Sequence, residues 1–277
     1  MDKTGIIWTE KTWNPVTGCK QITSGCAYCY AKTIAERMRG QAFPNGFGLT
    51  YRPHRLNDPY RWKEPTLAFV NSMSDLFWEE ITDEYRDRVL DVIEDNPQHQ
   101  FQVLTKRHDV MLRYAKRRKL PANFWAGVTI EDAKNYALRI EALRKVDAEI
   151  RFISFEPLIG DIGQSLDLSA IQWVITGGES GTHLWQPKLM EQRALVLYDR
   201  DVKKWLPKPH AVDWIRRIRD NAIINGTAYF HKQWGGSYPE AAGRVLDGRT
   251  WNEMPRYPGD KTEIDNAYLR KLEGATL

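Results

Sequence analysis

The chain has 277 residues, of which 42% are hydrophobic and 12% aromatic, and its formal net charge is +4. These values exclude a disordered or low-complexity protein, and the length favours one α/β barrel over two small domains. The segment from Met1 to Gly5 lacks the apolar core of a signal peptide, and no apolar run reaches transmembrane length. We therefore expect a soluble, cytoplasmic protein with no membrane partner.

In chain order, short apolar runs alternate with amphipathic stretches, which is typical of repeated β-α units around a parallel sheet. We expect a first strand within residues 6–18. A helix is expected over residues 31–38, where apolar residues fall at helical spacing, and Gly40 stands where a helix ends. Residues 41–65 show no period and predict an excursion over the mouth of the site or along one edge.

The units become regular from residue 67 on. Four amphipathic faces predict helices, at 85–93, 111–115, 136–143 and 211–222. The expected strands are 67–71, 101–105, 124–129, 151–155, 173–176 and 227–231. The sequence therefore predicts an α/β fold, a partial (β/α)6-7 barrel over residues 1–234, with an irregular C-terminal extension over residues 235–277 that packs on the barrel.

All three cysteines, Cys19, Cys26 and Cys29, lie within eleven positions of one another. An odd set of thiols cannot pair among itself, so the spacing indicates metal or cluster ligation. A structural zinc site needs a fourth ligand, which His54 or His108 could supply. Three thiolates without a fourth protein ligand instead leave one iron of a four-iron, four-sulfur cluster open to a small molecule. Both alternatives stay open at this point.

Polar residues follow nearly every expected strand, at the end where a parallel barrel places its active site. Each of them could also be an ordinary helix cap. That alternative is weaker for Glu156, which Pro157 follows directly, and for Glu179, which lies in a glycine-rich turn. We expect the strand-end residues to share one rim with the cysteine loop, the candidates being Asn71, Ser72, Lys106, Thr129, Glu131, Glu156, Gly177, Gly178, Glu179 and Lys232.

The stretch Cys26-Ala27-Tyr28-Cys29 resembles the last part of the radical S-adenosylmethionine (SAM) signature, in which an upstream cysteine supplies the third ligand. The usual signature has three residues between its first two cysteines, whereas this chain has six, Lys20 to Gly25. Together with residues 155–158 and 177–181, the N-terminal pattern is similar to a set of uncharacterised radical SAM-like proteins of phages and bacteria.

The resemblance implies a partial barrel of the radical SAM type whose [4Fe-4S] cluster is held by Cys19, Cys26 and Cys29. SAM would chelate the open iron and be cleaved reductively to a 5′-deoxyadenosyl radical, with electrons from a donor such as flavodoxin or ferredoxin. The implied cofactor-binding residues are Tyr28 near the adenine, Asn71 and Ser72 at the methionine end, Thr129 and Glu131 at the ribose, and Gly177 and Gly178 at the adenine or ribose. Lys106, Glu156 and Glu179 are left as catalytic candidates, with Lys232 beside them for the substrate.

Basic residues interleaved with aromatics in residues 41–65, and the basic run 116–119, suit phosphates and stacked bases. They predict a DNA, RNA or nucleotide substrate in a modification or repair reaction. Solvated surface charge is the plainer alternative for the same residues. The alternative function is that of a non-catalytic, zinc-stabilised nucleic-acid-binding protein. A partner protein that supplies the substrate to the enzyme is a separate expectation.

Overall fold

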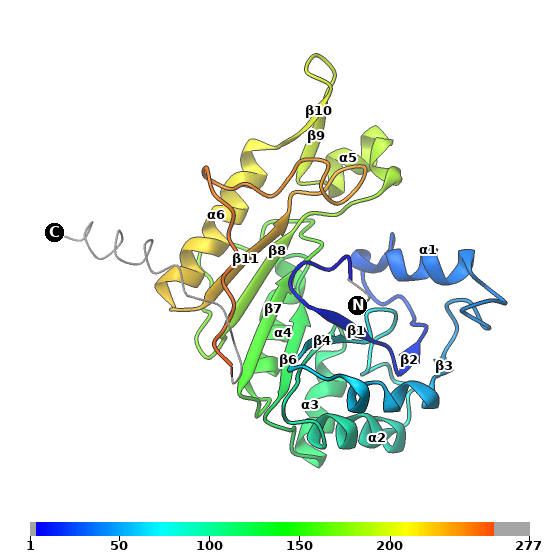
Figure 1. Ribbon diagram of the computed structural model, residues 1–277. Coiled ribbons are helices and arrows are strands. Elements are labelled where there is room, and N and C mark those ends of the chain that lie inside the picture. The colour runs from blue at the N-terminus through cyan, green and yellow to red at the C-terminus, as the bar shows by residue number, and fades with distance from the viewer. Residues whose placement is uncertain (1–3, 258–277) are drawn as a thin grey trace.

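The computed structural model describes residues 4–257 of the chain. Seven strands form one sheet that curls into a half-barrel, in the order β1-β4-β5-β6-β7-β8-β11, and every neighbouring pair is parallel (Figure 1). The strands are β1 (Lys11–Trp13), β4 (Leu67–Val70), β5 (Gln100–Thr105), β6 (Phe124–Thr129), β7 (Ile150–Phe155), β8 (Trp173–Gly177) and β11 (Ala228–Gln233). The predicted α/β partial (β/α) barrel is confirmed.

Helices cover the convex face of the sheet, so the central strands are buried on both faces and are almost continuously apolar. Side chains cap two of these helices, because Thr82 and Asp132 accept hydrogen bonds from the backbone N–H groups of Tyr85 and Asn135. The helices are α1 (Tyr30–Arg37), α2 (Asp83–Glu94), α3 (His108–Arg117), α4 (Ala133–Arg144), α5 (Pro187–Arg193) and α6 (Pro209–Ile224). All except α5 were predicted.

An aromatic cluster fills the lower half of the barrel interior. At its centre the ring of Trp173 contacts those of Trp125 and Phe152, with centroids 6.0 and 5.5 Å away. Phe152 also lies so close to Gly127 that a Cβ there would be 2.2 Å from its ring, which requires glycine at this point of β6. The buried members of the cluster are Trp8, Leu67, Phe69, Trp125, Ile150, Phe152, Trp173, Ile175 and Phe230. This cluster therefore fills the part of the interior that is farther from the carboxyl ends of the strands, and the interior is open toward those ends.

The excursion at residues 41–65 contains short pieces of structure. Its strand β3 (Thr50–Tyr51) pairs with β2 (Val16–Thr17), and two 3₁₀ helices follow at Pro53–Asn57 and Pro59–Arg61. A hairpin of β9 (Val196–Asp199) and β10 (Lys204–Pro207) was not predicted, and Figure 1 shows it projecting from the body of the molecule.

The described part of the C-terminal extension lies against the barrel. The backbone N–H of His231 donates to the carbonyl of Trp251, and Met254 and Tyr257 pack against the interior aromatic cluster. Residues 258–277 lie outside the described part of the chain, and the domain boundary at 234/235 stays a prediction. No helix within residues 4–257 is long and apolar enough to cross a membrane.

Candidate active site

A cavity of about 1090 Å³ lies at the carboxyl ends of the barrel strands, above the aromatic cluster. Trp8, Phe69 and Leu104 contribute to its floor, and Phe47 and Gly48 bring the 41–65 excursion to its wall. The predicted site residues that line it are Cys19, Cys26, Cys29, Tyr28, Asn71, Ser72, Lys106, Thr129, Glu156, Gly178, Glu179 and Lys232. Glu131 and Gly177 lie just behind this lining, against residues that form it. The structure thus brings the predicted residues together, while their individual roles stay predictions.

The cysteine loop enters the cavity through a turn at Gly18. This residue has a φ of 92°, and a Cβ here would lie 2.2 Å from the carbonyl oxygen of Gly48, so only glycine fits. The backbone N–H of Cys19 then donates to the carbonyl of Phe47, and the loop ends where Cys29 caps the start of α1.

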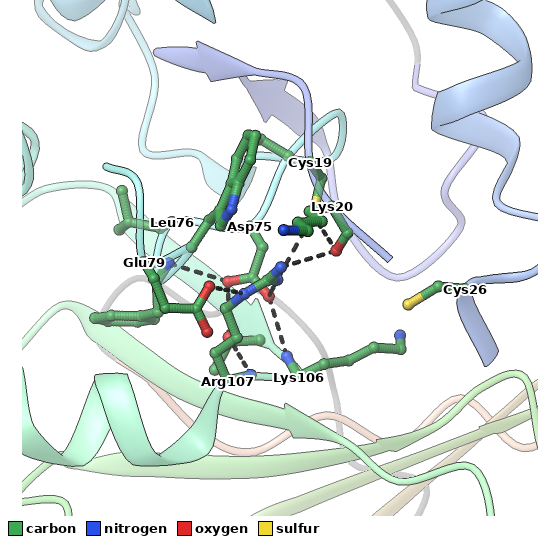
Figure 2. A network of polar contacts seen from close by, with 12 residues as sticks. Cys19, Lys20, Cys26, Asp75, Leu76, Glu79, Lys106 and Arg107 are labelled. Carbon is green, nitrogen blue, oxygen red and sulfur yellow. Dashed lines mark hydrogen bonds and ion pairs between the residues drawn. The ribbon is translucent and has the colours of Figure 1, made fainter. Parts of the chain in front are cut away.

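Arg107, directly after β5, is the centre of a polar network beneath Cys19 (Figure 2). Its side chain is only 2% exposed and donates to Asp75 at 3.0 Å, to Glu79 at 2.8 Å and to the Cys19 sulfur at 3.6 Å. Burial opposes the charge of the guanidinium, but Asp75, Cys19 and Glu79 outweigh it and raise the pKa of Arg107. Arg107 was not among the site residues predicted from sequence, although its position two residues after β5 was an available signal.

The environments of Cys19 and Cys26 differ. Burial, with the charge of Asp75, raises the pKa of the Cys19 thiol to about 12. Burial acts in the same direction on Cys26, but Lys106 and hydrogen bonds from the loop backbone lower its pKa overall. Figure 2 shows the Lys106 side chain extended toward Cys26. Lys106 therefore favours the thiolate form of Cys26, and the predicted role of Cys26 as a metal ligand stays a prediction.

Glu131, which follows β6, is fully buried and all its contacts are with the protein. It accepts a hydrogen bond from Thr23 in the cysteine loop at 2.7 Å and one from Arg139 at 2.6 Å, with the Lys106 ammonium 3.8 Å away. These contacts hold the loop, and the predicted ribose contact of Glu131 stays a prediction.

Glu179, which follows β8, accepts hydrogen bonds from Nε and Nη2 of Arg193, the last residue of α5, at 2.7 and 2.5 Å. His183 lies 3.2 Å from the same carboxylate and stacks face to face on Tyr28, with ring centroids 3.8 Å apart. Arg193 also donates to the carbonyl of Ser24 at 3.0 Å. Glu179 thus supports the loop around Tyr28, and its predicted catalytic role stays a prediction.

Glu156 and Lys232, from β7 and β11, form an ion pair of 2.5 Å across the end of β8, and their side chains are 17% and 18% exposed to the cavity. A Cβ at Gly177 would lie 3.1 Å from Glu156, and one at Gly178 would lie 2.0 Å from the Trp234 carbonyl oxygen. Packing therefore accounts for both glycines, and their predicted contact with SAM stays a prediction.

Asn71 offers an unused hydrogen-bond donor at the cavity. It is 3% exposed, has a φ of 59°, and uses its side-chain oxygen to accept from the backbone N–H of Val16 at 3.3 Å. Asparagine tolerates this left-handed conformation better than most residues. Its Nδ2 is buried and has no partner in the described part of the chain. Ser72 exchanges hydrogen bonds with Asn14 at 3.1 and 3.3 Å.

Within residues 4–257, no three His, Cys, Asp or Glu side chains converge closely enough to hold a single metal ion. A zinc ion requires such convergence, because all its ligands bind one point at about 2.0–2.3 Å. The cysteines of a four-iron cluster each bind a different iron, so thiols spread around one cavity fit a cluster better than a single ion.

A family model described as "Protein of unknown function (DUF5131)" matches residues 3–194 and 206–255. The chain belongs to the DUF5131 family. The gap in this match, residues 195–205, covers most of the β9–β10 hairpin. No curated protein matches this DUF5131 chain.

Solved structures of spore photoproduct lyase share the fold. A cysteine-to-serine variant of that enzyme is 16% identical, with a TM-score of 0.50, and a complex with dinucleoside spore photoproduct is 13% identical, with a TM-score of 0.51. Both matches cover 86% of this DUF5131 chain and 78% of the other. The partial (β/α) barrel that the sequence predicted is thus shared with these structures.

Proposed function

We propose that this DUF5131 protein is a radical SAM enzyme that acts on a nucleic acid or nucleotide, in modification or repair. The observation that carries the proposal is that Cys19, Cys26 and Cys29 line one cavity together with the polar residues at the carboxyl ends of the strands. A barrel of this type places its reacting groups at that end.

The three cysteines would hold a [4Fe-4S] cluster and leave its fourth iron to SAM. Cluster and SAM together supply a 5′-deoxyadenosyl radical, which takes a hydrogen atom from the substrate. Asn71 Nδ2, buried without an acceptor, would donate to an oxygen at the methionine end of SAM. The Tyr28 ring, which stacks on His183, would lie next to the adenine. A flavodoxin or ferredoxin would bring the electron.

The charges around the cavity favour an anionic substrate. Four carboxylates line the cavity, and each of them forms an ion pair. The pairs are Glu36 with Arg39, Asp75 with Arg107, Glu156 with Lys232, and Glu179 with Arg193. Lys20 and Lys32 also line the cavity, and among the described residues no carboxylate lies within 4 Å of either ammonium. The remaining positive charge suits phosphates, and a structure of the same fold holds a dinucleoside.

The test is anaerobic reconstitution of the full chain with iron and sulfide. We expect a brown protein with about four irons per chain, and reduction in the presence of SAM should release 5′-deoxyadenosine. Cys26→Ala and Cys29→Ala should each lose most of the iron and all of this product. Thr33→Ala, an exposed change one turn after Cys29, is the matched control and should keep both. One zinc and no iron per chain would contradict the proposal and support the zinc-stabilised binding protein.

A further inference from the structure

The six residues between Cys19 and Cys26 are contacted by three charged side chains that come from different parts of the barrel. We propose that Arg107, Glu131 and Arg193 act as positioning residues that fix this segment before any metal group binds. The consequence for cluster assembly rests on the proposed function, whereas the ordering of the loop does not.

Arg107 fixes the beginning of the segment. It donates to the carbonyl of Lys20 at 2.8 Å while the same guanidinium contacts the Cys19 sulfur and Asp75. Asp75 is itself held by the hydroxyl of Thr105 at 2.7 Å. With Glu79 this buried guanidinium has four partners and little freedom, so the backbone at Lys20 is tied to the end of β5.

Glu131 fixes the middle. It accepts from the Thr23 hydroxyl at 2.7 Å, and Arg139 holds its other oxygen at 2.6 Å. The chain then passes directly over this side chain, because a Cβ at Gly25 would lie 2.5 Å from Glu131 Cγ. Glycine at position 25 is therefore explained by close approach to the end of β6.

Arg193 fixes the end. It donates to the carbonyl of Ser24 at 3.0 Å, and its guanidinium lies 5.2 Å from the centre of the Tyr28 ring. Glu179 anchors Arg193 by two short hydrogen bonds. The segment is thus attached at residues 20, 23 and 24 to three separate elements of the barrel.

This arrangement supplies a physical reason for the lengthened gap. A longer loop has more conformations to lose when its cysteines must bind, and that entropy opposes assembly. Three charge-assisted contacts remove these conformations in advance, so the two cysteines are presented together.

Hydrogen exchange of the full-length, metal-free chain tests the ordering. The reporters are the amides of Cys26, Ala27 and Cys29, each of which donates to a carbonyl within the loop. Removing one charged contact should speed their exchange about tenfold, because a hydrogen bond to a charged group contributes about one factor of ten or more. We expect this for Arg107→Lys, Arg193→Gln and the milder Thr23→Val, which deletes only the hydroxyl that binds Glu131.

Arg86→Lys is the matched control. Arg86 is also a buried arginine, but it binds the carbonyls of Leu76 and Trp78 and does not line the cavity. It should leave loop exchange unchanged. If the loop amides of Thr23→Val and Arg193→Gln exchange at the wild-type rate, the inference is wrong, whether or not Arg107→Lys folds.

Reconstitution separates this result from the proposed function. If both hold, the three loop variants should bind less iron than wild type and Arg86→Lys should not. A wild-type chain that takes up no iron, with loop exchange still faster in the variants, would overturn the enzyme and leave the ordered loop standing.

Discussion

At the scale of single residues, the buried acids around the cavity fall into two groups. The carboxylate oxygens of Glu131 and Glu179 accept hydrogen bonds from arginines, and Glu131 also accepts one from the cysteine loop. These two residues therefore stabilise the structure around the loop. Glu156 faces the cavity and binds one partner, Lys232, whose ammonium keeps further donors for a substrate. Of the three catalytic candidates predicted from sequence, Glu156 thus lies open to the cavity, whereas Lys106 lowers the pKa of Cys26, and all three catalytic roles stay predictions.

A buried histidine in β11 gives a prediction for pH. His231 is fully buried, its Nδ1 lies 2.9 Å from the Thr176 hydroxyl, and Arg244 donates to its carbonyl. Burial, with the charge of Arg244, lowers its pKa from 6.5 to about 3. The unfolded chain therefore binds a proton between these values that the folded chain does not, and His231 costs stability as the pH falls below 6.5, by up to about 1.4 kcal/mol per pH unit.

The variant His231→Asn isolates this effect, because asparagine can keep the bond to Thr176 but does not titrate. At pH 7 it should be less stable by about 1–3 kcal/mol, from the smaller side chain. At pH 4.5 the difference should shrink by about 2–3 kcal/mol. Urea unfolding of both proteins at the two pH values measures it, and a difference that does not change with pH would contradict the assignment.

At the scale of elements, acidic residues of helix α2 pair with the two arginines of the basic run at residues 116–119. Arg118 pairs with Asp91 at 2.8 Å and with Glu94 at 3.2 Å, and Arg117 pairs with Asp83 at 3.4 Å and with Asp87. Two of the four cations that were expected to bind nucleic acid are therefore paired with acidic residues on the neighbouring helix. The sequence could not show this, because the partners lie 24 to 34 positions away in the chain.

This network predicts an effect on stability that is separate from binding. Arg117→Gln with Arg118→Gln should lower the free energy of unfolding by a modest amount, because the pairs are partly exposed. Lys116→Gln with Lys119→Gln removes the same charge from side chains that form no ion pair in the described part of the chain, and should change stability by less than about 0.5 kcal/mol. Equal losses in the two double variants, measured by urea unfolding, would show that the network contributes nothing specific.

Element by element, the sequence predicted what depends on local pattern. Continuous apolar runs marked β4 to β8, and Thr82 and Asp132 show why two helices begin where they do. The β9–β10 hairpin was missed because only Val196 and Trp205 of its strands are buried, which is too little for an alternating pattern. Helix α5 was missed because none of its seven residues is buried.

At the scale of the whole molecule, the sequence could predict which residues of the candidate site lie near one another. It could not predict which of them form hydrogen bonds or ion pairs. Because parallel strands end at one rim, topology alone brings the cysteines and the strand-end residues together. Which carboxylate holds the loop and which faces the cavity depends on Arg107, Arg139 and Arg193, whose partners lie between 8 and 169 positions away. Such pairings leave no periodic trace in a single sequence.

The distribution of charge over the molecule yields the last prediction. Lys20 and Lys32 line the cavity, and neither has a carboxylate partner within residues 4–257. Lys116 lies in α3 and Lys119 follows this helix, and neither lines the cavity. If phosphates enter at the cavity, Lys20→Gln with Lys32→Gln should weaken binding of single-stranded oligonucleotides and reduce the slope of log affinity against log salt by about 1–2, since each phosphate contact of a single strand contributes about 0.7. Lys116→Gln with Lys119→Gln carries the same change in net charge and should leave affinity and slope near wild type. Fluorescence anisotropy between low and moderate salt measures both, and equal effects of the two double variants would mean that binding follows net charge and not the cavity.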